Sequence, residues 1–253
     1  MLVLCSNDDG ILARGLECLE RAAQPLGDVF VVAPDREQSA TSHALTLHHP
    51  LRPVQLGPNR WQVDGTPTDC VMLAIEALMP VRPKFVLSGI NHGPNMGEDV
   101  LYSGTVAAAM EGLALGVPAI AVSFAGRVLR GDDTLMLQHV EPLAKLLQHL
   151  TSLPAFPADT LFNVNLPPIP AAEVKGVKLT RLGQRVFSDS IARMKDPWGR
   201  PIYWIGGGSV KWSSGEGTDV AAVNEGFISV TPLHLDVTHQ ARLDDAALWW
   251  KAP

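Results

Sequence analysis

The segment from residue 85 to residue 115 joins a short apolar strand to a helix through a polar loop, and this restricts the possible folds. The apolar run Phe85–Leu87 is typical of a buried strand. Residues 88–102 are rich in asparagine and glycine and include a proline, as in a loop of defined shape. An alanine-rich helix, Val106–Leu115, is predicted to follow Ser103-Gly104-Thr105. In α/β proteins, anionic ligands bind where such a loop hands over to a helix.

The helix start at Ser103-Gly104-Thr105 is therefore a candidate phosphate site. Backbone N–H groups of a first helical turn lack partners within the helix, and the helix dipole favours an anion there. Gly104 lets the backbone approach a ligand closely, and Ser103 and Thr105 add two hydroxyls. Serine at this position is also a common N-cap with no ligand. The asparagine-glycine loop in front of it favours phosphate binding.

Buried apolar runs alternate with helical segments through residues 1–166. This alternation predicts an α/β fold with a doubly wound, mainly parallel, Rossmann-like sheet. The expected strands are Leu2–Cys5, Val29–Ala33, Phe85–Ser88, Ala119–Ser123 and Leu161–Asn165. The expected helices cover residues 16–26, 70–78, 106–115 and 135–150, the last interrupted at Pro142. Three prolines between residues 44 and 63 indicate an excursion into β-hairpins.

The pattern changes after Pro167, so we predict a catalytic part, 1–166, and an extension, 167–253. Within the extension, Asp196-Pro-Trp-Gly199 is typical of a hairpin turn, and aromatic residues gather around it. Such an arm suits a subunit contact, and a local mini-core is the alternative. The chain then returns to a strand, 226–232, and ends in an amphipathic tail.

Composition and charge narrow the class of protein. The 253 residues are 46% apolar and 18% charged, as in globular proteins, and no apolar run is long enough to cross a bilayer. No signal peptide is apparent, and Cys5, Cys18 and Cys70 suit buried thiols, so we expect a cytoplasmic protein without membrane contact. A formal charge of −6 argues against binding of a nucleic acid duplex. A small phosphorylated substrate remains compatible if a metal supplies positive charge.

Polar loops after the first, second and a later strand should open on the same edge of the sheet. They offer the carboxylates of Asp8 and Asp9, the hydroxyl of Ser39 and the amide oxygen of Asn91. Oxygen ligands suit one hard divalent cation, Mg²⁺ or Mn²⁺. A turn with solvated aspartates is the alternative for the first loop.

Histidines do not have the spacing of a zinc site, so zinc is disfavoured. His48 and His49 are interpreted as a surface pair, and His92 either contacts substrate or stabilises its loop. A single metal that binds a phosphate oxygen and polarises water would suit phosphoryl transfer. The candidate catalytic pair is Asp8 and Asp9. Asp9 is the nearest candidate base, although we expect water activation mainly by the metal.

Several motifs resemble the SurE family, the survival-protein E phosphatases or nucleoside 5′-monophosphate phosphatases. They occur in the family's order over nearly the whole chain, and the loop joined to Tyr-Ser-Gly-Thr-Val is the most specific of them. The matching segments are Asn7–Ile11, Ala33–Asp35 with Ser39, Gly65–Pro67 with Asp69-Cys70, Ser88–Asn91, Tyr102–Val106, Met110–Gly112, and Ile228–Leu233 with Asp236 and Thr238.

The resemblance implies a metal-dependent phosphatase for nucleoside monophosphates, in some members also for 3′-nucleotides and short polyphosphate. It implies one divalent cation on Asp8, Asp9, Ser39 and Asn91, and phosphate contacts from Asn95 and from Ser103, Gly104 and Thr105. It also implies a homodimer or homotetramer that pairs through a hairpin, here about 187–205, and exchanges the tail after Thr231.

Other functions fit less well. A module that binds nucleotide without cleaving it would gain nothing from two adjacent carboxylates. A serine hydrolase at Ser39 or Ser103 would be expected to show Gly-x-Ser-x-Gly, and a dinucleotide oxidoreductase Gly-x-Gly-x-x-Gly; neither motif is present. An aspartyl-phosphate phosphatase with Asp8 as nucleophile is a closer alternative, although the Asp-x-Asp spacing is missing.

Overall fold

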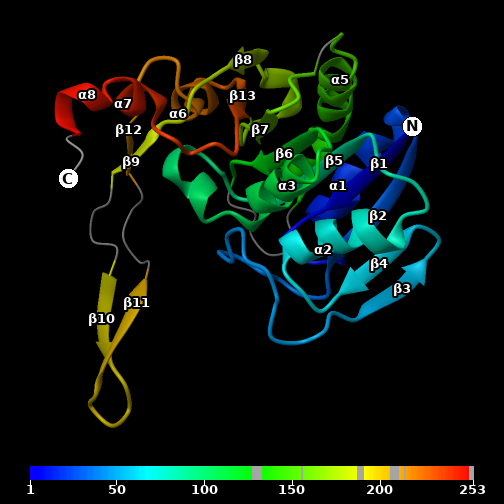
Figure 1. The fold of residues 1–253 in the computed structure, drawn as a ribbon, viewed down its shortest axis with the longest axis horizontal. Coiled ribbons are helices and arrows are strands. Elements are labelled where there is room, and N and C mark those ends of the chain that lie inside the picture. The colour runs from blue at the N-terminus through cyan, green and yellow to red at the C-terminus, as the bar shows by residue number, and fades with distance from the viewer. Residues whose placement is uncertain (127–132, 155, 187–190, 206–210, 214, 251–253) are drawn as a thin grey trace.

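The computed structural model describes residues 1–253 except 127–132, 155, 187–190, 206–210, 214 and 251–253. Its centre is a nine-stranded sheet in which most neighbouring strands are parallel (Figure 1). In spatial order the strands are β3 (Pro53–Gly57), β4 (Arg60–Val63), β2 (Asp28–Pro34), β1 (Leu2–Ser6), β5 (Phe85–His92), β6 (Ala119–Phe124), β7 (Leu161–Leu166), β13 (Ile228–Leu233) and β8 (Val177–Leu179). The predicted doubly wound sheet is confirmed.

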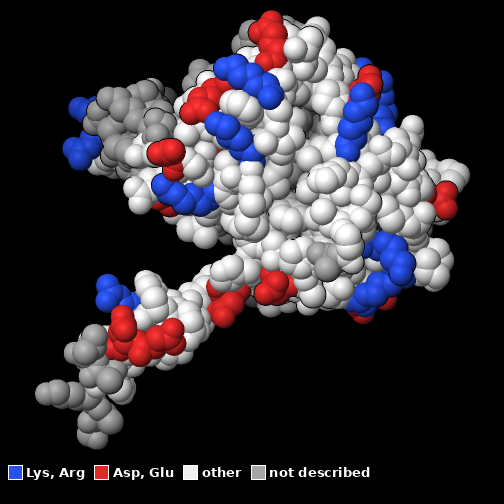
Figure 2. Space-filling model, turned by 90° about the horizontal axis from the view of Figure 1, so that it is seen from above, with Lys and Arg blue, Asp and Glu red and all other residues white. Residues whose placement is uncertain are grey.

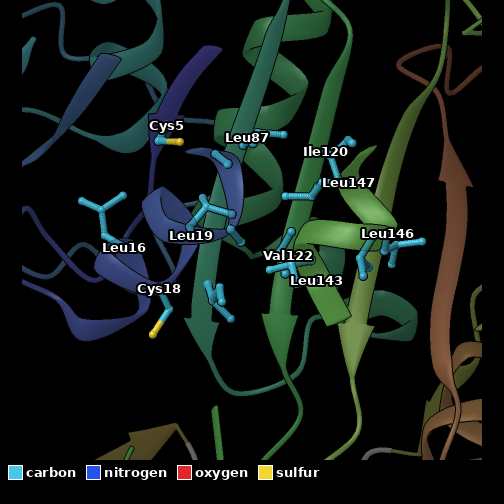
Figure 3. Close-up of a cluster of buried hydrophobic side chains, with 14 of the residues drawn as sticks. Cys5, Leu16, Cys18, Leu19, Leu87, Ile120, Val122, Leu143, Leu146 and Leu147 are labelled. Carbon is cyan, nitrogen blue, oxygen red and sulfur yellow. The ribbon is translucent and has the colours of Figure 1, made fainter. Parts of the chain in front are cut away.

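Helices cover both faces of this sheet. On one face lie α1 (Arg14–Ala23), α4 (Thr134–Gln138) and α5 (Val140–Thr151), and on the other α2 (Pro67–Leu73) and α3 (Gly104–Ala114). Successive side chains of a strand point to opposite faces, so Val3 and Cys5 pack toward α1, and Leu4 packs toward α2 and α3. Figure 3 shows Leu16 and Leu19 of α1 in the first of these two cores.

Local sequence explains where the helices begin and break. Thr66 and Asp69 form a capping box with Pro67 in the first turn, so α2 begins three residues before the predicted start at Cys70. It continues as a π-helical turn, η2 (Ala74–Leu78). The helix predicted for 135–150 is interrupted at His139, and Pro142 lies in the first turn of α5, where its missing N–H is tolerated.

One predicted boundary was wrong. Residues 89–92 belong to β5 rather than to the loop, because Asn91 and His92 pair with Ser123 and Phe124 of β6. The hairpin predicted between residues 44 and 63 is formed by β3 and β4, which pair antiparallel. The loop after β5 therefore begins at Gly93 and contains one 3₁₀ helix, η3 (Gly97–Leu101).

The extension contributes to the sheet and also leaves it. β13 lies antiparallel beside β7 and is followed in the sheet by β8, while α6 (Asp219–Asn224) leads into β13. β9 (Gln184–Val186) pairs with β12 (Lys211–Ser213), and β10 (Ile191–Lys195) pairs with β11 (Pro201–Ile205). The turn 196–199 joins β10 to β11 as predicted, and this arm projects from the sheet (Figure 1). The division at residue 166 and the role of the arm in oligomers stay predictions; residues 187–190 of the predicted arm lie outside the described residues.

The remaining described helices are short: η1 (Gln24–Leu26), η4 (Ala171–Glu173), α7 (Gln240–Asp244) and α8 (Ala246–Trp249). Cys5, Cys18 and Cys70 are buried and free. In the described part of the chain, no helix is both long and apolar enough to cross a membrane. On the face shown in Figure 2, basic and acidic side chains lie in small mixed groups rather than in one broad basic patch.

Candidate functional site

The loops that follow β1, β2 and β5 meet at one edge of the sheet, because these strands are parallel neighbours. The first two loops are bound to each other by backbone hydrogen bonds. The N–H of Ile11 donates to Pro34 O at 2.8 Å, and that of Gln38 donates to Asp8 O at 2.7 Å. Gly10 has a φ of +96°, and a side chain there would press on the backbone of Arg36. The loops after β1 and β2 are therefore held in close contact at this edge.

Asp8 lies against the start of α3. Its carboxylate is buried and accepts a hydrogen bond from the Thr105 hydroxyl. A Cβ atom on Gly104 would lie 2.8 Å from the Cβ of Asp8, so only glycine allows this approach. Burial raises the pKa of Asp8 to about 6, opposed by the hydrogen bond from Thr105 and supported by repulsion from Asp9.

Asp9 is held from the other side, by β5. Its Oδ2 accepts the backbone N–H of His92 at 3.3 Å. Burial raises the pKa of Asp9, while the nearby His92 lowers it. Two adjacent, largely buried carboxylates store electrostatic repulsion, which a bound cation would relieve.

The other two predicted metal ligands flank this pair. Asn91 donates its side-chain N–H to Gly93 O at 2.9 Å, which leaves the amide oxygen available to a cation. Ser39 is exposed, and its hydroxyl donates to Glu37 Oε1 at 2.6 Å. The structure thus brings Asp8, Asp9 and Asn91 to one edge and places Ser39 on the adjoining loop, with its hydroxyl directed to another partner.

This donor set fits a hard cation. Carboxylate, amide and hydroxyl oxygens are the ligands that Mg²⁺ and Mn²⁺ prefer. Within the described residues, no three His, Cys, Asp or Glu side chains group as metal ligands. A cation at this edge would therefore rest on two carboxylates completed by neutral oxygens.

The predicted phosphate residues are buried at the start of α3 and in the preceding loop. Ser103 is the N-cap of α3, and its Oγ accepts the N–H of Val106 at 3.0 Å. The Thr105 hydroxyl is engaged by Asp8, so the backbone N–H groups of the first turn are the donors best placed for phosphate. Asn95 directs its side-chain nitrogen inward, to Ser123 Oγ at 2.8 Å.

Two asparagines of β7 hold this loop and were missed from the sequence. Asn163 and Asn165 donate their side-chain N–H groups to the backbone oxygen of Asn95 at 2.8 and 3.0 Å. Asn165 Oδ1 also accepts the backbone N–H of Asn95 at 3.0 Å. The available signal was the alternation of asparagine with apolar residues in Leu161–Asn165, because most polar side chains at buried positions are hydrogen-bonded.

Asp219 was also missed, and it joins the loop after β5 to the root of the arm. Its buried carboxylate accepts backbone N–H groups from Gly97 at 3.0 Å, Gly183 at 2.7 Å and Val220 at 2.8 Å. Burial raises the pKa of Asp219, and the three hydrogen bonds lower it. Nearby, Met96 packs against Val220 and Val223 of α6. The extension thus forms the support beneath the predicted phosphate loop.

Known proteins of one family resemble this chain over nearly its whole length. The sequence model of the family described as "Survival protein SurE" matches residues 3–189. A "5'-nucleotidase SurE" of Gemmatimonas aurantiaca is 72% identical over 253 residues, which is 100% of both chains. A protein of the same name from Geobacter metallireducens is 48% identical, over 98% of this chain and 97% of its own. The crystal structure of a SurE protein from Aquifex aeolicus superposes with a TM-score of 0.86 at 41% identity, covering 98% of this chain and 99% of that one.

Proposed function

The chain belongs to the SurE family, and we propose that it is a 5′-nucleotidase that depends on one divalent cation. The substrate would be a nucleoside 5′-monophosphate, which water splits into a nucleoside and phosphate. This makes the chain a phosphoric monoester hydrolase. Sequence similarity to SurE proteins named 5′-nucleotidases supports the phosphatase activity. The proposed need for Mg²⁺ or Mn²⁺ rests on the chemistry of the site.

One observation carries the metal dependence: the carboxylate of Asp8 touches the helix start that would bind phosphate. A phosphate dianion on α3 would lie next to two carboxylates, and like charges at such short range repel strongly in a partly buried site. A cation held by the carboxylates would offset this repulsion. Neither a helix start alone nor an aspartate pair alone would require one.

The residues take distinct roles in this proposal. Asp8, Asp9, Asn91 and Ser39 would hold the cation, and the backbone N–H groups at the start of α3 would hold phosphate oxygens. The cation would supply positive charge to the phosphate and lower the pKa of an attacking water. Thr105 keeps Asp8 in place, and Asp9, which is less buried than Asp8, is the carboxylate best placed to take a proton.

The proposal is tested by phosphate release from 5′-AMP and 5′-GMP after treatment with EDTA. We expect no release without metal and recovery on addition of Mn²⁺ or Mg²⁺. Metal-independent release would keep the phosphatase and refute the cation site. Failure to release phosphate from nucleotides or from 4-nitrophenyl phosphate would favour a nucleotide-binding module. A phosphoenzyme trapped on Asp8 would instead favour the aspartyl-phosphate route. The same assay with 3′-nucleotides and short polyphosphate tests whether the proposed substrate range extends to them.

We also propose that the chain forms a homodimer or homotetramer through the arm. Trp198, Tyr203 and Trp204 on the arm are 78%, 58% and 64% exposed, and large apolar side chains at such exposure are typical of a subunit contact. Light scattering coupled to size exclusion should give a multiple of 27.2 kDa. A monomer at micromolar concentration would contradict this proposal.

A further inference from the structure

A cavity of about 340 Å³ lies beside the start of α3. Four segments enclose it: the loop after β2, η3, one face of α3 and the chain after β13. The lining residues are Ser42, His43, Val100, Leu101, Ser103, Ala107, Met110, His234, Leu235 and Val237. The cavity includes none of the predicted metal ligands but shares Ser103 with the predicted phosphate site.

The cavity follows α3 away from its start. Ser103, Ala107 and Met110 are spaced four and three residues apart, so they lie on one face of the helix. From the first to the last of them the helix rises about 10 Å, at roughly 1.5 Å per residue. A ligand whose phosphate is held at the helix start would therefore place its remaining part along this face. That distance suits a sugar and a base rather than a methyl or glycerol group.

The lining residues are suited to an uncharged ligand with flat apolar surfaces. None of the ten lining residues is Asp, Glu, Lys or Arg, and six are apolar: Val100, Leu101, Ala107, Met110, Leu235 and Val237. Hydroxyls and imidazoles supply the few polar groups, as in sites that bind small molecules by apolar contact and a small number of directed hydrogen bonds. A polyphosphate chain would find no cation among these side chains.

The imidazole of His43, one of the polar lining residues, is oriented by a carboxylate. Its Nε2 lies 2.8 Å from Oε2 of Glu111, a buried residue on α3. A carboxylate only accepts hydrogen bonds, so Nε2 carries a proton and donates. In the neutral ring, Nδ1 is then an acceptor, suited to a ribose hydroxyl or an amino group of a base. The Glu111 carboxylate thus fixes the orientation of the His43 ring and leaves Nδ1 as the acceptor for a ligand.

We propose that this cavity is the nucleoside subsite of the enzyme and that His43, oriented by Glu111, is a specificity-determining residue within it. The inference rests on the proposed nucleotidase function. It adds that selection for nucleotides over smaller phosphomonoesters arises along α3, separately from the site of phosphate cleavage.

The test compares two substrates that share only the phosphate ester. His43→Ala should raise KM for 5′-AMP about tenfold, the loss expected for one directed hydrogen bond, with kcat nearly unchanged. Hydrolysis of 4-nitrophenyl phosphate should change by less than about twofold, because that substrate has no ribose. His43→Gln keeps an N–H that can reach Glu111 and should recover part of the loss. His48→Ala, an exposed histidine of the same segment outside the cavity lining, is the matched control and should leave both substrates unaffected.

A second variant fills the cavity instead of removing a hydrogen bond. Met110→Trp should raise KM for 5′-AMP and leave hydrolysis of 4-nitrophenyl phosphate nearly unchanged. In the unmodified protein, adenosine should compete with 4-nitrophenyl phosphate, and each variant should weaken that competition. Equal losses on both substrates would show a structural role for His43 and overturn the subsite. The subsite would also be overturned if the protein hydrolyses 5′-AMP but adenosine does not compete and neither variant loses activity on 5′-AMP selectively. That result would leave the proposed nucleotidase function intact. No nucleotide hydrolysis by the metal-loaded protein would refute the function itself.

Discussion

The hydroxyl of Thr105 donates a hydrogen bond to the carboxylate of Asp8, two residues that are 97 positions apart in the chain. The first turn of α3 and the loop after β1 are thereby joined in one site. Their contact places a candidate metal ligand directly against a candidate phosphate-binding helix start. Several measurements depend on this contact and on the groups that support it.

Thr105→Val should weaken the site with little change in shape. The buried carboxylate of Asp8 loses a hydrogen bond from its neighbour, which costs about 1–3 kcal/mol in the free energy of unfolding. The altered carboxylate should also bind Mn²⁺ less tightly and lower kcat/KM for 5′-AMP. Calorimetric titration with Mn²⁺ and thermal unfolding measure the two effects. Thr105→Ser keeps the hydroxyl, so its Mn²⁺ affinity and thermal stability should be close to those of the unmodified protein. Equal values for the two variants would contradict the role of this hydrogen bond.

Gly104→Ala should lower activity through a steric effect. The new methyl group would lie 2.8 Å from the Cβ of Asp8, closer than such atoms approach, so Asp8 or the helix start must shift. Displacements of this size at a catalytic site cost about 100-fold in rate. Gly57→Ala is the matched control, since a methyl group there meets no atom within 4 Å. Steady-state kinetics on 5′-AMP measure the effect. Full activity of Gly104→Ala would show that the close approach of residue 104 to Asp8 is unnecessary.

Asp8→Ala and Asn91→Ala should abolish metal-dependent turnover and leave the fold intact. Both substitutions remove a proposed oxygen ligand, and Asp8→Ala also removes a repulsive buried charge. We therefore expect Asp8→Ala to unfold at a temperature close to that of the metal-free unmodified protein. Circular dichroism checks the fold and calorimetry checks Mn²⁺ affinity. Near-normal activity in either variant would refute the proposed site.

Asp219→Asn should loosen the loop after β5 without removing any group from the site. The substitution replaces one accepting oxygen by an NH₂ group, which then faces a backbone N–H from Gly97 or Gly183. We expect a loss of about 1–3 kcal/mol in stability and a higher KM for 5′-AMP. The affinity for Mn²⁺ should hold, because Asn91 lies on β5. Asp196→Asn, where a half-buried carboxylate in the turn of the arm also accepts backbone N–H groups, is the control and should affect KM little. An unchanged KM in Asp219→Asn would show that the loop does not need this support.

Stability should fall as the solution becomes acidic, in part because of His139. Burial lowers the pKa of this imidazole below its usual 6.5, Nε2 donates to Ile169 O at 2.9 Å, and the buried Nδ1 has no partner. The unfolded chain takes up the proton first, so the contribution of His139 is complete above pH 6.5 and is lost as pH falls toward its lower folded pKa. His139→Gln keeps a donor for Ile169 and removes the titration. Urea unfolding at pH 7 and pH 5 should show a smaller loss in this variant; an equal loss would assign the acid sensitivity to other groups.

The layered α/β fold, and the sheet edge at which the candidate site lies, can be predicted from the amino-acid sequence. Apolar periodicity within each segment specifies strands and helices, and parallel strands bring their carboxyl ends to one edge. Asp8, Asp9 and Asn91 follow or end such strands, and capping at Thr66 and Ser103 is likewise written in a few adjacent residues. All of these features depend on neighbours within a few positions of the chain.

Which side chains contact one another depends on how the helices and strands pack, and local sequence does not specify it. Asp219 reaches Gly97 across 122 positions, and Asn165 reaches Asn95 across 70. His43 finds Glu111, and the hydroxyl of Ser39 turns to Glu37. A hydrogen bond depends on distance and direction within a few tenths of an ångström, and these are fixed by the packing of whole elements rather than by residue type. The sequence therefore predicts where the site lies. The packing of whole elements determines which residues support the site and forms the cavity along α3.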